Sequence, residues 1–592
     1  MSGKTFAEKI LGAPAGSIVF RQPDLVLTHD NTASISKTFE KMGGTKVAFP
    51  ERLLVVLDHN APPTTSKLAN DYQSIRNLVR EQNIMRFHDA GEGICHELSA
   101  LHTRPGMIVT GSDSHTCTAG AFNALAAGID RTEAAGLWKK GETWFRVPES
   151  LKIVLKGKLR EGVAAKDLAL WIIGMLGADG ANYLSVEFHG DGVKSLCIAD
   201  RMTLANMASE MGAKNAVFPP DKVLADYYGK ESLAGVWADE NATYTRTIEI
   251  DLSEIFPVVA APHQVDNVHP VSEYEGTEIQ QALIGTCTNG RMEDLRAAAG
   301  ILNGKQIKPG VQLLIIPASR KVYLQAVEEG LVSIFLKAGA NILSSSCGPC
   351  LGTGQGIPAD GTTVVSTANR NFKGRMGNPN ASIFLASPAV TAASALAGYI
   401  TDPSSLSKGK KFPFPAIRQN TYTIPPGENR KTGNVWNYAD IDHLNTDQMF
   451  AGNLTYTILS SDADAIRPHL FKGFDENFAN KVEPGDIILA GENFGCGSSR
   501  EHPAVGLAHA GIKAVIVKSV NRIFYRSCIN QGLLLLVHPG LVNAYKPGDV
   551  VTIHPEKGEI LLNDTVFTFP PLPETLMDIV RHKGLVAYYK SH

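Results

Sequence analysis

The chain has 592 residues, of which 44% are hydrophobic and 19% are charged, as expected for a globular protein of about three or four domains. Its net charge of −3 gives no reason to expect nucleic acid or an anionic membrane as a partner, so any anion site must be local. Eight cysteines are too few for a disulfide framework in a chain of this length, and no apolar run approaches the ~20 residues of a membrane span, so we expect a cytoplasmic protein without membrane segments.

The N-terminal part of the chain alternates short apolar runs with helical stretches. The first residues lack the apolar run of a secretory signal and predict a short amphipathic helix. Runs such as Leu53–Leu57 and Met107–Thr110 predict buried strands, and Val163–Leu176 predicts a helix. This rhythm is typical of α/β proteins with parallel sheets, in which reactive groups lie beyond the carboxyl ends of the strands. We therefore predict an α/β body over residues 1–403.

Three histidines of this body stand beside acidic residues or at predicted strand tips. His59 follows Asp58, His115 follows Asp113 by two residues, and His96 lies in Gly-Glu-Gly-Ile-Cys-His-Glu. A carboxylate fixes the tautomer of an imidazole and supports its protonated form, which suits proton transfer. Any one of the three would more often be a structural histidine, but together they favour an acid–base site.

Two short motifs carry three cysteines. Cys287 lies in Gly-Thr-Cys-Thr-Asn-Gly, and Cys347 and Cys350 lie in Ser-Ser-Ser-Cys-Gly-Pro-Cys-Leu-Gly. Thiolates hold iron–sulfur clusters, usually four for a four-iron cluster, so three would leave one iron open to act on substrate as a Lewis acid. A lone C-x-x-C could also be a redox pair, half of a zinc site or two loop cysteines, although a glycine-rich loop follows Cys350 and neither motif supplies a second close pair of ligands for zinc.

A basic segment follows the cysteines. Arg370 and Arg375 stand five residues apart in Asn-Arg-Asn-Phe-Lys-Gly-Arg, close to a glycine. Guanidinium groups fixed in this way suit a small di- or tricarboxylate. The commoner alternative for such a cluster is a solvated basic loop.

The composition of the chain changes after residue 403. Residues 404–446 are rich in serine, lysine and proline and predict a linker, and residues 447–592 predict a compact final domain. In that domain we expect a strand over Asp486–Ala490, a glycine-rich turn, a helix over Glu501–Ala510 and a strand over Ile512–Val517.

The glycine-rich turn, Gly-Glu-Asn-Phe-Gly-Cys-Gly-Ser-Ser-Arg, places Ser498, Ser499 and Arg500 at the start of the predicted helix. It matches neither the dinucleotide fingerprint nor the phosphate-binding loop. Free N–H groups and the helix dipole favour an anion there, Arg500 can grip a carboxylate, and a serine hydroxyl can serve as base or nucleophile. The alternative is that Ser498 only caps the helix.

Six segments, taken together and in this order, resemble the aconitase superfamily of iron–sulfur hydro-lyases. They are Thr-His-Asp-Asn-Thr at 28–32, Gly-Ser-Asp-Ser-His-Thr-Cys at 111–117, the two cysteine motifs, Thr-Ala-Asn-Arg-Asn-Phe-Lys-Gly-Arg at 367–375 and the turn through residue 502. The sequences around Cys287 and in the glycine-rich turn are similar to those of the isopropylmalate isomerase/homoaconitase branch. That branch commonly has separate large and small subunits, which here look joined through residues 404–446.

The resemblance implies a fold and a cofactor. The fold is α/β, with a three-domain body around the cluster in residues 1–403 and a smaller swivelling domain in 447–592, so that no separate small subunit is required. Cys287, Cys347 and Cys350 would ligate a 4Fe–4S cluster with one iron lacking a protein ligand.

The resemblance also assigns catalytic roles. Ser498 would take the proton from the carbon beside a carboxylate, and His59, with Asp58 behind it, would protonate the leaving hydroxyl. Two further histidine–carboxylate pairs would support them, namely His115 with Asp113 and His96 with Glu187.

The implied substrate is a small di- or tricarboxylate, with no nucleic acid as a partner. Arg370, Arg375, Arg500 and Ser499 would bind its carboxylates, His29 would contact it, and Asn369 and Asn289 would shape the cluster edge. Isopropylmalate is the first candidate, and homocitrate, citrate and a dimethylmalate are the others. A cluster-free RNA-binding regulator and a zinc-dependent dehydratase are the contrasting hypotheses.

One segment departs from the branch pattern where the substrate's variable group should be recognised. Here Arg467-Pro-His-Leu-Phe-Lys472 follows an Asp-x-Asp stretch. His469, Leu470 and Phe471 favour a partly apolar pocket, as isopropylmalate would need, whereas Arg467 and Lys472 favour a further carboxylate. Residues 130–140 are also more charged than expected, without a functional explanation.

Overall fold

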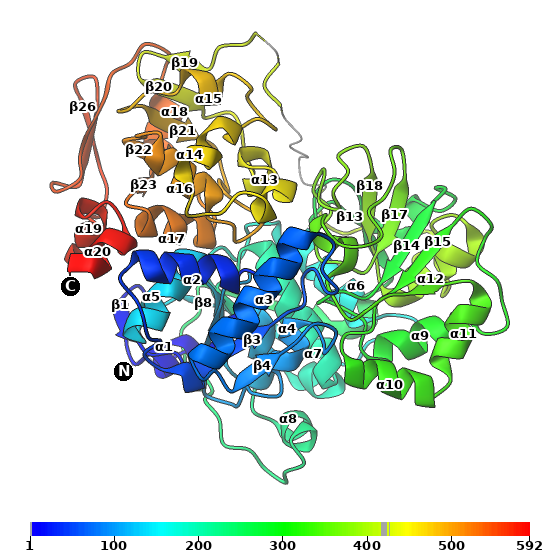
Figure 1. Ribbon diagram of the computed structural model, residues 1–592. Helices are drawn as coiled ribbons and strands as arrows, with labels where there is room; N and C mark the ends of the chain where they lie inside the picture. Colours follow the sequence, from blue (N-terminus) through cyan, green and yellow to red (C-terminus); the bar gives the residue numbers. More distant parts are fainter. Residues whose placement is uncertain (1–2, 416–422, 426, 592) are drawn as a thin grey trace. The chain divides into compact units, whose positions relative to one another are not determined.

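The computed structural model describes residues 3–415, 423–425 and 427–591 (Figure 1). The chain forms two compact units. Unit 1 consists of Met1–Thr32, Pro50–Gly128 and Trp144–Gln419, and unit 2 consists of Ala33–Phe49, Ile129–Thr143 and Asn420–His592. Unit 2 thus takes two short segments from the N-terminal part, which the sequence patterns do not foresee. No helix within the described residues combines the length and apolarity that crossing a membrane requires.

Unit 1 contains three larger sheets, which confirms the expected α/β class. The first has the order β4-β3-β2-β5-β6 with all neighbours parallel. Its strands are β2 (Leu25–Thr28), β3 (Leu53–Val56), β4 (Arg86–His88), β5 (Ile108–Gly111) and β6 (Leu125–Gly128). The predicted strands at Leu53–Leu57 and Met107–Thr110 are therefore confirmed to within one residue. In addition, β1 (Ile18–Arg21) pairs with β7 (Thr143–Arg146).

The second sheet is fully parallel in the order β10-β9-β8-β11, and the third has seven strands in the order β13-β12-β18-β17-β14-β15-β16. In the third sheet β12 is antiparallel to both of its neighbours, β13 and β18, and the other neighbouring strands are parallel. The strands of the second sheet are β8 (Ser150–Lys156), β9 (Ser185–His189), β10 (Asn215–Val217) and β11 (Arg246–Asp251). Those of the third are β12 (Val258–Ala260), β13 (Val268–Pro270), β14 (Gln281–Ile284), β15 (Gln312–Ile315), β16 (Asn341–Ile342), β17 (Thr363–Ser366) and β18 (Ser382–Leu385).

Helices cover the third sheet on both faces, because its strands are apolar on both sides. Ala282 and Ile284 of β14 pack into one core with α9, α10, α11 and α12, whereas Leu283 packs into another core with α6 and α7 (Figure 1). Each fully buried aliphatic side chain stabilises the fold by about 2 kcal/mol. The helices of unit 1 are α1 (Phe6–Leu11), α3 (Ser66–Glu81), α4 (Cys95–Ser99), α6 (Ala165–Leu176), α7 (Ile198–Met207), α8 (Lys222–Tyr227), α9 (Met292–Leu302), α10 (Arg320–Glu328), α11 (Leu331–Ala338) and α12 (Pro388–Ala397).

Unit 2 is built on a five-stranded sheet with the order β19-β20-β21-β22-β23. The strands are β19 (Lys431–Thr432), β20 (Val435–Tyr438), β21 (Ile487–Ala490), β22 (Ala514–Val517) and β23 (Leu534–Val537). The predicted strand–turn–helix–strand unit is confirmed, since α16 (His502–His509) connects the parallel strands β21 and β22. The expected linker is wrong for residues 431–438, which form β19 and β20; its residues 416–422 and 426 lie outside the described residues.

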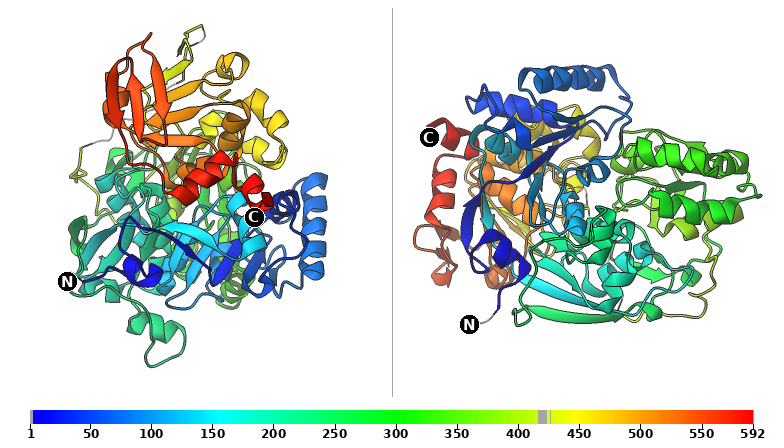
Figure 2. Two further views of the ribbon diagram at one scale, coloured as in Figure 1. Left: turned by 90° about the vertical axis from the view of Figure 1, so that its left-hand side faces the viewer. Right: turned by 90° about the horizontal axis from the view of Figure 1, so that it is seen from below.

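A second, antiparallel sheet of unit 2 is coloured orange-red in Figure 2 and comprises β24 (Val551–His554), β25 (Glu559–Leu562) and β26 (Thr565–Thr568). The other helices of this unit are α2 (Thr32–Lys41), α5 (Arg131–Lys140), α13 (Thr446–Met449), α14 (Ala463–Ile466), α15 (Phe478–Lys481), α17 (Arg522–Asn530), α18 (Pro539–Ala544), α19 (Glu574–Arg581) and α20 (Leu585–Ser591).

The charged stretch at residues 130–140 is explained by burial in unit 2. It forms helix α5, whose N-cap, Asp130, accepts a hydrogen bond from the backbone N–H of Glu133. Glu133 forms an ion pair with Arg526 of α17, and both side chains are 1% exposed. Asn530 of α17 donates to Asp130. The charges of this stretch therefore join α5 to α17.

Candidate active site

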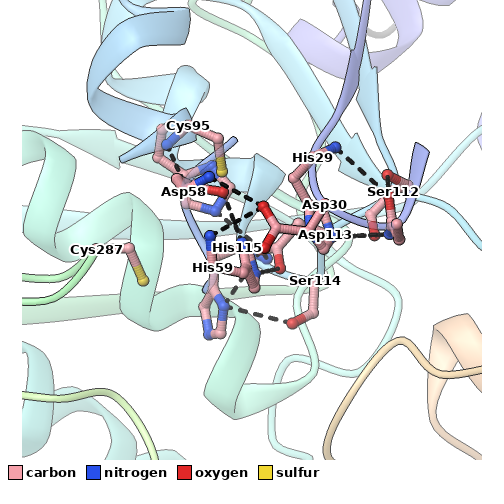
Figure 3. A network of polar contacts seen from close by, with 12 residues as sticks. His29, Asp30, Asp58, His59, Cys95, Ser112, Asp113, Ser114, His115 and Cys287 are labelled. Carbon is pink, nitrogen blue, oxygen red and sulfur yellow. Dashed lines mark hydrogen bonds and ion pairs between the residues drawn. The ribbon is translucent and has the colours of Figure 1, made fainter. Parts of the chain in front are cut away.

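Asp30 organises the turn that follows β3. It stands beyond the end of β2, and its carboxylate accepts the backbone N–H groups of Asp58 (3.0 Å), His59 (3.1 Å) and Asn60 (2.8 Å). The hydroxyl of Tyr72 donates to the same carboxylate over 2.8 Å. Burial raises the pKa of Asp30. Because β2 and β3 are parallel neighbours, their carboxyl ends bring these side chains to one edge of the sheet (Figure 3).

His59 is held by the carboxylate beside it in the chain. Its Nδ1 lies 2.7 Å from Oδ1 of Asp58, and the backbone N–H of Cys95 donates to the other oxygen over 2.7 Å. Burial acts to raise the pKa of Asp58, but the charge and hydrogen bond of His59 hold it below its ordinary value. The ring of His29 stacks on that of His59 at 3.8 Å between centroids. The Asp58–His59 pair thus has the form that imidazole acid–base chemistry needs.

Asp113 is the common partner of three histidines. Its Oδ1 lies 2.8 Å from Nε2 of His96 and accepts the backbone N–H of His115, and its Oδ2 lies 3.4 Å from Nε2 of His59 (Figure 3). Burial acts to raise the pKa of Asp113, but hydrogen bonds from these histidines hold it well below its ordinary range. A carboxylate that stays ionised among imidazoles can stabilise a proton on any of them.

The expected pairing of His96 with Glu187 is wrong. Glu187 lies on β9 in the second sheet, where its carboxylate accepts the backbone N–H of Phe6 (3.0 Å) and the hydroxyl of Tyr244 (2.9 Å). It therefore anchors the start of helix α1, and His96 pairs with Asp113 instead.

The ring of His115 has a partner that the sequence patterns do not reveal. Its Nε2 lies 2.7 Å from Oε1 of Glu210, and the other oxygen of Glu210 accepts Nε of Arg370 over 2.9 Å. Burial acts to raise the pKa of Glu210, but Arg370 and His115 lower it to about 2. In the sequence, the only feature that could have indicated Glu210 is that it is the single acid in the stretch Met-Ala-Ser-Glu-Met at 207–211.

The cysteine loops follow strands of the third sheet. Cys287 comes three residues after β14, and a Cβ at Gly285 would lie 2.4 Å from the carbonyl oxygen of Ile316, so this turn requires glycine. Cys347 and Cys350 lie beyond β16 at a short 3-10 helix. All three thiols are buried and none forms a disulfide.

The side chains of two asparagines contact cysteine sulfur atoms. Nδ2 of Asn369 donates to Sγ of Cys287 over 3.1 Å, and Sγ of Cys350 donates to its Oδ1 over 3.7 Å. Asn206, which the sequence patterns do not indicate, donates to Sγ of Cys287 over 3.5 Å. Nη2 of Arg375 lies 3.9 Å from Sγ of Cys350. Asn289, predicted to shape the cluster edge, instead bonds Asp294 at the start of α9, over 2.8 Å.

The donor set fits an iron–sulfur cluster. Burial, and then the neighbouring Cys350, raise the pKa of Cys287 to about 12, and burial raises the pKa of Cys347 well above its ordinary value. Buried thiols that resist ionisation become thiolates when cationic iron binds them, and amide donors to sulfur are typical of cluster sites. One donor atom each of Cys287, His96 and His115 lie within 4.8 Å of one another, and Asn369 contacts both Cys287 and Cys350, so these thiols adjoin the histidine network in unit 1.

The serine turn lies in unit 2, beyond the end of β21. The backbone N–H of Ser498 donates to Oγ1 of Thr446 over 3.0 Å, and this hydroxyl donates to the carbonyl of Ser498. Helix α16 has Glu501 as its N-cap, so the alternative that Ser498 caps the helix is wrong. Ser498 and Ser499 are half-buried.

Arg500 at the end of this turn is buried and held from two sides. Its Nη1 donates to the carbonyl of Phe450 over 2.9 Å, and its Nη2 lies 2.9 Å from Oδ1 of Asp447. Asp447 was not indicated by the sequence patterns.

The residues expected to recognise the substrate's variable group differ in their exposure to solvent. Leu470 and Phe471 are fully buried in the core of unit 2, so the expectation that they line a pocket is wrong. Arg467 and Lys472 are exposed.

Known proteins match the chain along most of its length. The aconitase family (aconitate hydratase) model matches residues 4–276 and 272–398, and the aconitase C-terminal domain model matches residues 439–540. The 3-isopropylmalate dehydratase large subunit 2 of Archaeoglobus fulgidus is 47% identical over 412 residues, which are 68% of this chain and 99% of that protein. The methanogen homoaconitase large subunit of Methanocaldococcus jannaschii is 44% identical over 417 residues, which are 67% of this chain and 99% of that protein.

A solved structure of a 3-isopropylmalate dehydratase from Methanocaldococcus jannaschii is 38% identical, covers 27% of this chain and 93% of that chain, and has a TM-score of 0.24. The large-subunit relatives cover about two thirds of the chain, and the C-terminal domain model matches residues that follow those matched by the aconitase family model. One polypeptide carries both parts, and the chain belongs to the aconitase family of hydro-lyases.

Proposed function

We propose that the chain isomerises a hydroxy acid with two or three carboxylates by dehydration and rehydration, and that the substrate is 3-isopropylmalate. The observation that carries this proposal is that the buried thiol of Cys287 adjoins His96 and His115 of the histidine–carboxylate network in unit 1. Relatives named 3-isopropylmalate dehydratase large subunit, at 44–47% identity, support the substrate.

Cys287, Cys347 and Cys350 would hold a 4Fe–4S cluster with one iron lacking a protein ligand. Such a cluster supplies a Lewis-acidic iron that polarises the hydroxyl to be eliminated. The chain's own contribution at this point is to keep the three thiols together and unpaired, with Asn369 and Asn206 donating to sulfur.

The proton transfers are assigned to Ser498 and His59. Ser498 takes the proton from the carbon beside a carboxylate, and His59 gives a proton to the hydroxyl on the neighbouring carbon, so that water leaves and an alkene forms. Addition of water in the opposite sense yields the isomer. The contact between His59 and Asp58 supports this role, because the carboxylate stabilises the protonated ring.

The remaining histidines would orient and support the acid. Asp113, bonded to His96, His115 and His59, keeps negative charge beside the transferred proton. Glu210 ties His115 to Arg370.

The substrate's carboxylates are assigned to arginines and one serine. Arg370 and Arg375 would act from unit 1, and Arg500 and Ser499 from unit 2, since guanidinium groups bind carboxylates in a bidentate manner. His29 would contact the substrate, and Asn289 would shape the cluster edge through its contact with Asp294. Arg467 and Lys472 would meet the variable end of the substrate.

We further propose that residues 447–592 serve as the small-subunit equivalent of a catalytic body in residues 1–403, so that no separate small subunit is needed. The two family models on one polypeptide support this. A cytoplasmic location is supported by the eight cysteines, none of which forms a disulfide in the part of the chain that the structure describes.

Homocitrate is the second candidate substrate. Relatives named methanogen homoaconitase large subunit, or probable members of that group, are 43–46% identical, as similar as the dehydratases. Leu470 and Phe471 are buried in the core, so they do not form the apolar pocket that would favour isopropylmalate over homocitrate.

A substrate panel tests the proposal. The anaerobically reconstituted chain should be offered isopropylmalate, homocitrate, citrate and dimethylmalate while the absorbance of the alkene is followed. Turnover of isopropylmalate above the others supports the proposal, and turnover of homocitrate selects the second candidate. A chain that takes up a cluster but turns over none of the four acids contradicts the proposed reaction.

A further inference from the structure

Lys166 is a buried cation in the body of unit 1. It stands in the first turn of α6, and its side chain is 0% exposed. Its Nζ donates to the carbonyl oxygens of Thr367 (2.9 Å) and Ala368 (2.6 Å) and lies 3.5 Å from Sδ of Met207. These partners are two neutral carbonyls and a thioether, and the acid Glu210 is paired with Arg370 instead.

This position is unfavourable for an ammonium group. Burying a charge is costly unless an opposite charge compensates it, and the first turn of a helix carries the positive end of the helix dipole. Burial lowers the pKa of Lys166 to about 7, and the neighbours that oppose this most are Cys287 and Cys350. As thiolates, Cys287 and Cys350 would therefore compensate this charge most strongly, ahead of Glu210 and Asp294.

The two carbonyls that Lys166 binds also lead directly to the cysteines. Thr367 and Ala368 follow the end of β17 and precede Asn369. The amide of Asn369 contacts Sγ of Cys287 at 3.1 Å and that of Cys350 at 3.7 Å. Lys166 thus fixes the backbone that places Asn369 between the two sulfur atoms.

We propose that Lys166 is a positioning residue whose ammonium charge offsets the negative charge of the Cys287 and Cys350 thiolates and whose hydrogen bonds fix Asn369 between them. This inference rests on the proposed cluster. A positive charge near the sulfur atoms stabilises the more reduced, more negative state, so Lys166 raises the reduction potential of the group that the cysteines hold. It also slows the loss of iron from these ligands.

The test uses the full chain, reconstituted anaerobically, with three variants. Lys166→Met removes the charge and the donor, Lys166→Gln removes the charge but retains a donor for the carbonyls, and Lys321→Met removes an exposed charge from α10 as the matched control. The readouts are the reduction potential, from an electron paramagnetic resonance titration, and the rate of bleaching in the presence of an iron chelator. Neither depends on turnover.

We expect both Lys166 variants to have a lower potential than the wild type and to bleach about tenfold faster, the range seen when a partner of a metal ligand is lost. Lys321→Met should match the wild type. If Lys166→Met does not fold, Lys166→Gln decides the question. A folded Lys166→Gln protein with the wild-type potential and bleaching rate would overturn the inference. A wild-type chain that binds no cluster would instead overturn the proposed cofactor.

Discussion

Nε2 of His115 lies 2.7 Å from Oε1 of Glu210, although 95 residues separate them in the chain. Both side chains are buried, and the second oxygen of Glu210 holds Arg370 at 2.9 Å. This carboxylate therefore joins the loop after β5 to the loop after β17, and with it the histidine network to the segment beside the cysteines.

Replacing Glu210 by Gln should lower turnover by roughly 10- to 100-fold, because the buried partners lose the charge that orients them. It should also change how stability depends on pH. The folded pKa of about 2 lies below the ordinary value of 4.5, so the stabilisation by Glu210 is complete above pH 4.5 and is lost as the pH falls towards 2. Its full size is on the order of 3 kcal/mol.

Urea unfolding of the wild type and Glu210→Gln between pH 3 and 7 measures this effect. The difference between the two proteins should be largest near neutral pH and shrink in acid. Glu328→Gln, an exposed acid of α10, is the control. A difference that does not change with pH would contradict the assignment.

Replacing Ser498 by Ala should reduce turnover by about 10²- to 10⁴-fold, as expected when a catalytic base is removed. The thermal midpoint should hardly change, because Ser498 is bonded to Thr446 through its backbone N–H and carbonyl, which the substitution retains. Steady-state kinetics measures the effect, and Ser333→Ala, an exposed serine of α11, is the matched control. Near wild-type turnover of the Ser498 variant would refute its role as base.

The ion pair between Glu133 and Arg526 predicts a purely structural effect in unit 2. Nε of Arg526 donates to Oε2 of Glu133 over 3.1 Å, and both side chains are 1% exposed. Glu133→Gln should lower the free energy of unfolding by about 3–5 kcal/mol, because it removes the charge that compensates a buried guanidinium. Calorimetry should show this loss, while Glu329→Gln, at a surface pair with Arg296, changes little. Equal effects of the two substitutions would be inconsistent with burial as the cause.

Leu470 and Arg467 should behave differently although they are close in sequence. Leu470→Ala should destabilise unit 2 by about 2–5 kcal/mol and leave substrate preference unchanged, because the side chain is fully buried in the core. Arg467→Ala should leave stability unchanged and alter the ratio of kcat/KM for isopropylmalate and homocitrate, since this side chain is exposed. An unchanged ratio in the Arg467 variant would remove it from the substrate site.

Local patterns in the sequence predict the strands that carry the site, since β3, β5 and β21 begin and end within about one residue of the apolar runs. They also indicate the cysteines and histidines, because motif spacing is local. They fail where packing between elements decides the partner. His96 lies on α4 and meets Asp113, whereas Glu187 lies on β9 of the second sheet and is held at the start of α1. Leu470 looks like a pocket residue in sequence but fills the core of unit 2, which only the tertiary fold determines.

We claim above all that Cys287, Cys347 and Cys350 hold an iron–sulfur cluster. The most direct test is the content of iron, zinc and acid-labile sulfide per chain after anaerobic reconstitution, in the wild type, in Cys287→Ser and in Cys197→Ser, whose half-buried thiol lies outside the group. We predict about four iron and four sulfide per chain in the wild type and in Cys197→Ser, and a marked loss of both in Cys287→Ser. Stoichiometric zinc without sulfide in the wild type, or an unchanged iron and sulfide content in Cys287→Ser, would contradict the claim.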